Sequence, residues 1–306
     1  MKRYPCCLLA TCCIPWDEEG NFLEDVFRRE VASMLKGTPH LYLFGTAGEG
    51  YAVTDRQFDA IVRVFADAMK AGGAEPMIGV INLSLPTIVE RIGRCRDMGV
   101  RQFQISLPSW GALSEREVFE FFRQTCGRFP DCQFLHYNLM RTKRLVTARE
   151  YAKLAEVHPN LVATKNSTDS LERIEELLLF APQLQHFLNE TGFAHGSLIA
   201  ECGLLGSLVT LNWRQGRIFF EAGRRRDVAT ILPLLHEINA LTRDLVESVG
   251  GEAHIDGAFD KMFCRLHDPQ FPLRMLPPYS GVSVERWERF AAVVREKYPR
   301  WLPEAR

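Results

Sequence analysis

The chain has 306 residues, of which 46% are hydrophobic and 25% are charged, and its formal net charge is −1. This composition is typical of an ordinary globular protein with a large core, and the near-neutral charge argues against nucleic acid or an anionic membrane surface as a partner. No apolar run approaches the roughly 18 residues of a membrane-spanning helix.

The first part of the chain is apolar and rich in cysteine. The run from Cys6 to Ala10 is shorter than the ~7–15 apolar residues of a signal peptide, so we interpret it as part of a first strand. Nine cysteines, an odd number in a long chain, do not resemble a disulfide framework. The adjacent pairs at 6–7 and 12–13 lack a C-x-x-C spacing and would point to opposite faces of a strand, which argues against a metal site. We expect buried free thiols and a cytoplasmic protein.

Eight short apolar runs are typical of buried strands. They are Cys7–Thr11, Leu41–Phe44, Met77–Ile81, Phe103–Leu107, Phe134–Tyr137, Leu161–Thr164, Gln185–Leu188 and Gly206–Thr210. Their starts fall 21 to 36 residues apart, a spacing that suits repeated strand–loop–helix units.

The segments between these runs show helical periodicity, and several begin with capping residues such as Thr54, Ser114 and Thr147. The expected helices are Leu23–Lys36, Asp55–Ala71, Pro86–Met98, Ser114–Cys126, Ala148–Val157, Ser170–Phe180 and Ala194–Glu201. Eight strands that alternate with helices predict a (β/α)8 TIM barrel. A doubly wound open sheet is the competing fold, but no glycine-rich dinucleotide turn follows any of the first strands.

Strand signals mostly vanish after Trp213. The expected helices there are Ile218–Arg224, Val228–Val249, Ala258–Leu266 and Val284–Tyr298. We therefore divide the chain into a barrel core, residues 1–215, and a C-terminal helical region, residues 216–306, packed on the barrel. The apolar content of this region could serve packing or contacts between subunits.

The active site of such a barrel lies at the C-terminal ends of its strands. Polar residues follow most of the expected strands: Gly45–Gly50, Pro108–Trp110, His136–Asn138, Lys165, Asn189–Thr191, Thr210 and Asn212. Lys165 is the only one of eight lysines that ends a strand-like run. Burial there would disfavour its ammonium and lower its pKa, which suits an amine that attacks a carbonyl to form a Schiff base. Taken alone, a lysine that extends to solvent is the simpler interpretation.

Two further strand ends suit the same chemistry. The turn with Thr46 and Ala47 would leave backbone N–H groups free to hold a carboxylate, although it could also be a plain tight turn. Tyr137 offers a phenol that could transfer protons near Lys165, although it could also be a packed aromatic residue. An amine, a phenol and an anion-binding turn on one barrel are what a 2-keto acid needs to become an imine.

The same residues carry a resemblance to the dihydrodipicolinate synthase / N-acetylneuraminate lyase family of pyruvate-dependent class I aldolases. The similar stretches are Gly45-Thr46-Ala47-Gly48-Glu49, Tyr137-Asn138-Leu139-Met140-Arg141-Thr142, Val162-Ala163-Thr164-Lys165-Asn166-Ser167-Thr168 and Gly203-Leu204-Leu205-Gly206. The resemblance covers roughly residues 5 to 213, with the motifs in the family's order and spacing.

The resemblance implies roles for individual residues. Lys165 would form the imine and Tyr137 would transfer protons, while Thr46, with the backbone N–H groups of Thr46 and Ala47, would hold the substrate carboxylate. The other candidate substrate-binding residues are Trp110, Arg141, Thr191 and Leu208. The resemblance implies a small 2-keto acid as substrate, no metal and no organic cofactor, and a homodimer or homotetramer.

The chain also departs from the family pattern. Ala47 replaces a second hydroxyl residue, and Trp110 stands where synthases place a proton-relaying tyrosine; an indole N–H cannot shuttle a proton at neutral pH. The segment after Tyr137 is one residue shorter and lacks its proline, which puts the reach of Arg141 in doubt, and Asp169 replaces a glycine. These departures argue against the lysine-biosynthetic synthase and favour another lyase, aldolase or dehydratase, whose pocket would be partly walled by Trp110 and His136.

Three functions remain open at this point. The leading hypothesis is a Schiff-base lyase or aldolase, whose C–C cleavage and dehydration variants share their first steps. The second is a catalytically impaired family member that binds a 2-keto acid as a sensor or scaffold. The third is a metal-dependent barrel hydrolase, which the lack of any His-x-His or His-x-x-x-His pair disfavours.

Overall fold

The computed structural model describes residues 2–168 and 170–304, and its centre is a single sheet of eight parallel strands in chain order. The strands are β1 (Ala10–Thr11), β2 (Leu41–Leu43), β3 (Met77–Gly79), β4 (Gln102–Ile105), β5 (Gln133–Asn138), β6 (Leu161–Asn166), β7 (Gln185–Leu188) and β8 (Gly203–Leu204). A parallel bridge between Leu8, just before β1, and Leu204 of β8 joins the two edges. The prediction of a (β/α)8 barrel is confirmed.

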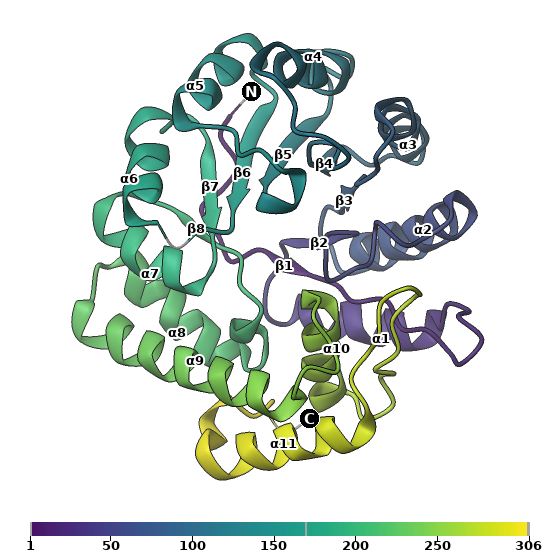
Figure 1. The fold of residues 1–306 in the computed structure, drawn as a ribbon, viewed down its shortest axis with the longest axis vertical. Coiled ribbons are helices and arrows are strands. Elements are labelled where there is room, and N and C mark those ends of the chain that lie inside the picture. Colours follow the sequence, from purple (N-terminus) through teal and green to yellow (C-terminus); the bar gives the residue numbers. More distant parts are fainter. Residues whose placement is uncertain (1, 169, 305–306) are drawn as a thin grey trace.

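Helices cover the outside of the sheet (Figure 1). They are α1 (Glu24–Leu35), α2 (Asp55–Ala71), α3 (Leu85–Asp97), α4 (Glu115–Thr125), α5 (Ala148–Val157), α6 (Leu171–Phe180), α7 (Glu190–Ile199) and α8 (Trp213–Arg224). Capping boxes at Thr54, Ser114 and Thr147 begin α2, α4 and α5. Each box satisfies backbone N–H groups that the first helical turn leaves unpaired, so these starts follow directly from the sequence.

The eighth strand lies elsewhere than expected. Gly206–Thr210 is not a strand: β8 is Gly203–Leu204, and Leu208–Thr210 forms a 3-10 turn, η2. The Leu208 N–H donates to the Glu190 carboxylate at 2.8 Å, and the Thr210 hydroxyl donates to the Ser207 carbonyl at 2.6 Å. These local bonds replace a strand ladder, while burial accounts for the apolar character of the run.

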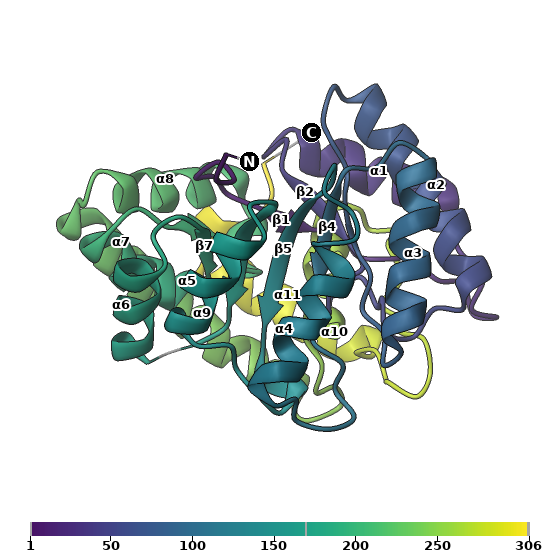
Figure 2. The ribbon, with the colours of Figure 1, turned by 90° about the horizontal axis from the view of Figure 1, so that it is seen from above.

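The C-terminal helices begin later than the expected division. The expected division at residue 215 falls inside α8, a helix that runs without a break from Trp213 to Arg224. The helices that follow are α9 (Val228–Val249), α10 (Asp256–His267) and α11 (Val284–Lys297), with a short η3 (Pro299–Trp301). Helix α9 packs on α7 and α8, and α11 packs on α9. Helix α10 lies between α1 and α9, close to β1 (Figures 1 and 2).

The core has two layers. A small cluster that includes Tyr42, Leu135, Ala163 and Phe187 fills the inside of the barrel, and a much larger one lies between the strands and the surrounding helices. Within the described residues, no helix combines the length and the apolar character needed to cross a bilayer. All nine cysteines have free thiols.

Candidate active site

Two polar side chains meet at the ends of neighbouring strands. Lys165 of β6 and Tyr137 of β5 are register partners in the parallel ladder, so their side chains leave the sheet on the same face. The Lys165 ammonium nitrogen lies 4.5 Å from the centroid of the Tyr137 ring. Tyr137 is 3% exposed, whereas Lys165 is half-buried and keeps contact with solvent. Pairing of the two strands therefore places an amine beside a phenol.

Neighbouring groups control the protonation of this pair. Burial disfavours the Lys165 ammonium, but Tyr137, Tyr42 and Asp256 outweigh that effect and raise the pKa of Lys165 above its usual value. Burial therefore acts in the expected direction, but the net pKa of Lys165 is raised rather than lowered. Burial would also raise the pKa of Tyr137, but the Lys165 ammonium lowers it below that of a free phenol, because positive charge favours the phenolate. Lys165 thus holds a proton that must leave before its nitrogen can act as a nucleophile.

A chain of neutral hydrogen bonds supports these strand ends from the opposite face. The Asn138 amide donates to Asn166 Oδ1 at 3.0 Å, and the Asn166 amide donates to Thr164 Oγ1 at 2.7 Å. Thr164 Oγ1 lies 2.7 Å from Nδ1 of His186, whose pKa burial lowers to about 4. Because side chains alternate along a strand, this network lies behind Lys165 and Tyr137 and supports their position without adding charge.

Thr46 and Ala47 lie in the turn that follows β2. They are 6% and 4% exposed, and Phe44 and Glu49 on either side have positive φ angles of 63° and 53°. Non-glycine residues rarely adopt such angles, so the surroundings hold the shape of this turn. The side chain of Thr46 is hydrogen-bonded to the Tyr137 hydroxyl. The turn therefore lies directly beside Tyr137.

Glu49, in the same turn, connects the barrel to its C-terminal helices. Its fully buried carboxylate lies 2.5 Å from the fully buried ammonium of Lys261 on α10. It also accepts hydrogen bonds from Trp16 Nε1 at 2.9 Å and from the Leu276 N–H at 2.7 Å. Buried charges are tolerated when they are paired and hydrogen-bonded this fully. Glu49 therefore anchors α10 and the loop that follows it, a role in structure rather than in chemistry.

Helix α10 brings two carboxylates toward Lys165. Asp260 is 7% exposed and hydrogen-bonded to the side chain of Ser207, and burial raises its pKa to about 7. Asp256 lies in the first turn of the helix. Both groups interact electrostatically with Lys165 and favour its ammonium.

The first turn of α10 also closes on the barrel loops. Asp256 Oδ1 lies 3.3 Å from Nη2 of Arg141, which follows β5 in the short 3-10 turn η1 (Met140–Thr142). A Cβ added at Gly257 would lie 3.0 Å from the Ala47 carbonyl oxygen, so a side chain there would require α10 or the turn to shift by a few tenths of an ångström. Arg141 therefore reaches the site region, where its charge is shared with Asp256.

Glu190 at the start of α7 adds a third carboxylate. Its Oε1 accepts the Leu208 N–H at 2.8 Å, and burial raises its pKa. A Cβ added at Gly206 would lie 2.2 Å from the carboxyl carbon of Glu190, so only glycine permits this approach. Leu208 thus contributes its backbone N–H to this hydrogen bond, and the residue is 6% exposed. Thr191 follows Glu190 in the first turn of α7 and is half-buried.

The two residues expected to wall the pocket lie in different surroundings. Trp110 is 83% exposed in the single chain, and its carbonyl oxygen accepts a hydrogen bond from the Lys143 ammonium at 2.8 Å. His136 points away from the barrel interior, because its Nδ1 lies 2.6 Å from the Tyr151 hydroxyl and its ring packs on Phe122. Alternation along β5 puts Tyr137 inside and His136 in the helix layer. Asp169 lies outside the described residues.

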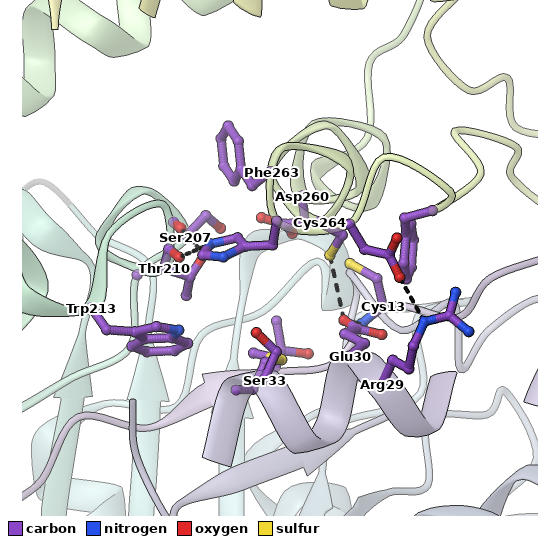
Figure 3. Close-up of a pocket in the computed structure, with 16 residues that line it drawn as sticks. Cys13, Arg29, Glu30, Ser33, Ser207, Thr210, Trp213, Asp260, Phe263 and Cys264 are labelled. Atoms are coloured by element: carbon purple, nitrogen blue, oxygen red, sulfur yellow. Dashed lines mark hydrogen bonds and ion pairs between the residues drawn. The ribbon is translucent and has the colours of Figure 1, made fainter. Parts of the chain in front are cut away.

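A cavity of about 50 Å³ lies next to the site, between α1, η2 and α10 (Figure 3). Its polar lining includes Cys13, Glu30, Ser207, Asp260 and Cys264. Asp260 is shared between this cavity and the surroundings of Lys165.

Sequence reasoning missed Asp256, Asp260 and Lys261. All three lie on α10, and the pattern of that segment predicted only a packing helix. The sequence signal available was a group of charged residues on a helix that also carries apolar residues. This pattern does not show which of the charged residues are buried until the surface that the helix packs on is known.

Comparisons with known proteins bear on the family and the fold of the chain. The sequence model described as "Dihydrodipicolinate synthetase family" matches residues 6–255. The chain is 25% identical over 199 residues to a 4-hydroxy-tetrahydrodipicolinate synthase of Thermus thermophilus. This alignment covers 63% of this chain and 65% of that enzyme. It is 20% identical over 242 residues to an N-acetylneuraminate lyase of Clostridium perfringens, covering 77% of this chain and 82% of that enzyme.

The fold is also similar to that of solved structures. The crystal structure of dihydrodipicolinate synthase from Aquifex aeolicus superimposes with a TM-score of 0.82 at 17% identity, covering 98% of this chain and 99% of that chain. In sequence, the chain spans less than two thirds of the length of the Thermus thermophilus synthase that it matches.

Proposed function

The chain belongs to the dihydrodipicolinate synthetase family, and we propose that it is a lyase or aldolase that forms a Schiff base with pyruvate or a related 2-keto acid. The observation that carries this proposal is the 4.5 Å separation between the Lys165 nitrogen and the Tyr137 ring. Relatives described as a synthase and a lyase support a reaction that makes or breaks a C–C bond. Dehydration of a 2-keto-3-deoxy acid would begin with the same steps.

In the proposed mechanism the amine of Lys165 is the nucleophile. The phenolate of Tyr137 takes a proton from the ammonium, and the nitrogen then attacks the keto carbon to give a carbinolamine. Tyr137 returns the proton to the carbinolamine hydroxyl, which leaves as water, and a protonated imine remains. The raised pKa of Lys165 and the lowered pKa of Tyr137 place this proton on the lysine at rest, so its transfer to the phenolate is an uphill step that precedes the attack.

The imine then acts as an electron sink for cleavage. The electron pair of the C–C bond moves into the iminium to form an enamine, and a base takes the hydroxyl proton of the fragment that leaves as an aldehyde. Protonation of the enamine carbon and addition of water release the keto acid and restore the amine of Lys165. Asp260, with a pKa of about 7, suits the proton transfers of this second half.

The substrate carboxylate is proposed to bind at the Thr46–Ala47 turn, through the Thr46 hydroxyl and the two backbone N–H groups. Ala47 offers no hydroxyl, and the loss of one such hydrogen bond costs roughly 0.5–1.5 kcal/mol. Binding of a carboxylate is therefore weakened but retained.

The rest of the substrate is proposed to be neutral or hydroxylated. Arg141 shares its charge with Asp256, and Asp260 and Glu190 add further carboxyl groups around Lys165. A second anionic group on the substrate would meet these carboxylates, and the nearby Arg141 is already paired with Asp256. This surrounding supports a lyase or aldolase other than the lysine-biosynthetic synthase.

Borohydride trapping tests the proposal. The protein is incubated with pyruvate and then with a panel of longer 2-keto acids, reduced, and analysed by intact mass and peptide mapping. We expect one adduct per chain, on Lys165, that disappears in Lys165→Ala and persists in the control Lys153→Ala, which changes an exposed lysine.

The trapping result and a turnover assay together separate the hypotheses. An adduct on Lys165 with turnover of an aldol or deoxy-acid substrate supports the enzyme. An adduct without turnover across the panel would favour the catalytically impaired binder, and no adduct with any 2-keto acid would contradict the Schiff-base mechanism.

We also propose that the protein forms a homodimer or homotetramer. The side chains of Trp110 and Met140 are 83% and 69% exposed, and association would remove such apolar surface from water. Light scattering coupled to size-exclusion chromatography measures the state directly, and a monomeric protein would contradict the proposal.

A further inference from the structure

Three potential metal ligands converge at one wall of the cavity beside α10. Cys13 follows β1, Glu30 lies on α1 and Cys264 lies on α10, and their ligand atoms all lie within 4.8 Å of one another. Figure 3 shows the two sulfur atoms and the carboxylate pointing toward one another. Cys264 Sγ lies 3.4 Å from Glu30 Oε1, which also accepts the Cys13 N–H at 2.8 Å. The fold thus brings together donors that are far apart in the sequence.

Glu30 has a further acceptor that the protein does not satisfy. Glu30 is 7% exposed, and its Oε2 is buried with no hydrogen-bond partner among the described residues. A buried carboxylate oxygen without a hydrogen-bond partner costs free energy. In native structures such an atom usually binds a water molecule or an ion. This oxygen belongs to the residue that already contacts both cysteines.

The donor set selects a class of ion. Thiolates favour zinc and other thiophilic metals over magnesium or calcium, and a carboxylate is a common third ligand for zinc. Zinc bound by three protein groups keeps one tetrahedral position for water, and here the neighbouring cavity of about 50 Å³ can hold that water. The observed spread of the ligand atoms requires only small side-chain movements to reach zinc–ligand distances of ~2.0–2.3 Å.

We propose that Cys13, Glu30 and Cys264 form a binding site for a thiophilic divalent cation, with Zn²⁺ as the preferred ion. The ion joins the end of β1, α1 and α10, three elements that otherwise meet through side-chain contacts. The three proposed ligands are not among the residues proposed for the Schiff-base chemistry, although Asp260 lines the cavity and also acts on Lys165. Its role is to hold α10, and with it Asp256 and Asp260, at a fixed position against the barrel.

Spectroscopic titration with Co²⁺ tests this site on the full chain, prepared without a histidine tag, reduced and freed of metal by a chelator. We expect one equivalent of Co²⁺ to bind with the strong visible bands of a tetrahedral ion and a sulfur-to-cobalt charge-transfer band, and Zn²⁺ to displace it. Cys264→Ser should weaken binding by about tenfold or more and reduce the charge-transfer band. Glu30→Gln should weaken binding but keep that band at saturating Co²⁺.

Cys126→Ser is the matched control, because Cys126 is a buried thiol at the end of α4, outside the cluster. This variant should bind Co²⁺ as the unchanged protein does. Thermal unfolding adds a readout that does not depend on cobalt spectroscopy: Zn²⁺ should raise the melting temperature of the wild-type and Cys126→Ser proteins but not of Cys264→Ser.

Two results would overturn the inference. One is a reduced wild-type protein that binds no stoichiometric Co²⁺ and is not stabilised by Zn²⁺. The other is a Cys13–Cys264 disulfide in the purified protein, combined with no metal binding after its reduction, which would assign the pair to redox chemistry instead.

Discussion

The two sides of the candidate active site are built in different ways. On the side of β5 and β6, Lys165 and Tyr137 are placed by backbone pairing, and behind them lies a network of neutral amide, hydroxyl and imidazole groups. On the side of α10, the helix brings carboxyl groups that are held through side chains, by the Glu49–Lys261 and Arg141–Asp256 pairs. The first side holds the groups proposed to react, and the second adds carboxyl groups that favour the Lys165 ammonium.

This difference separates the groups proposed to react from the groups that influence their pKa values. A strand register cannot shift by one residue without turning Lys165 to the other face, so the reacting groups are fixed together or lost together. A helix attached by side chains can change its charges while the strands stay in place. Variants on the strand side should therefore remove turnover, and variants on the helix side should change stability, pH dependence or affinity.

The largest effect is expected from Tyr137→Phe. Removal of the phenol takes away the nearest base and acid for carbinolamine formation and loss, so kcat should fall by about 10²- to 10⁴-fold. Steady-state kinetics on the substrate found by screening measures this, with Tyr279→Phe, a partly exposed tyrosine outside the pair, as the control. A kcat within a few-fold of wild type would show that another group carries the proton.

Glu49→Gln should have the largest effect on stability. The change leaves the fully buried Lys261 ammonium without its partner, and loss of one member of a buried ion pair typically costs about 3–5 kcal/mol. Urea unfolding measures the loss. Glu120→Gln, which removes an exposed pair with Arg123, should leave the midpoint unchanged.

The same measurement offers a check on the cause. If the unpaired charge is responsible, Glu49→Gln combined with Lys261→Met should recover part of the lost stability. A double variant as unstable as the sum of the single ones would point instead to lost packing.

Asp260→Asn should change the pH dependence of stability. The pKa of Asp260 is raised to about 7 in the fold, so this group favours the folded state at low pH and that contribution is lost as the pH rises through 7. The loss between about pH 6 and pH 8 should be roughly 1 kcal/mol, since one pKa unit corresponds to 1.36 kcal/mol. Urea unfolding at a series of pH values should show a flatter dependence in Asp260→Asn, and an unchanged slope would contradict the assignment.

The smallest effect is expected from Ala47→Ser. A hydroxyl at this position should strengthen carboxylate binding by roughly 0.5–1.5 kcal/mol, which corresponds to a KM for pyruvate lower by about two- to tenfold. Trapping of a neutral ketone that has no carboxylate should be unchanged in the same variant. An equal change with both compounds would mean that the substitution acts through α10, which packs on Ala47.

The sequence allowed more of the strand side to be predicted than of the helix side. The barrel follows from alternating apolar runs and capping boxes, and the residues proposed for the chemistry, Lys165 and Tyr137, end two of those runs. The eighth strand was misplaced because the buried run after Gly206 has the apolar character of a strand, although a local carboxylate bond holds it in a 3-10 turn.

The direction of the pKa shift of Lys165 cannot be predicted from its neighbours in the sequence. Burial alone lowers the pKa of a lysine, and the groups that reverse the effect include Asp256 and Asp260, more than 90 positions later in the chain. Likewise, Cys13 and Cys264 are too far apart for any spacing rule to connect them. Such pairs become visible only when the position of α10 is known.

The closure of the barrel has a consequence for its motions. Strands β1 and β8 have two residues each, and a single bridge at Leu8 and Leu204 joins them, whereas β5 and β6 are six residues long and paired along most of their length. Amide hydrogens at the β1–β8 seam should therefore exchange with solvent sooner than those of β5 and β6. The ring opens most readily at the seam, while the pair at Lys165 and Tyr137 lies in the part that opens last.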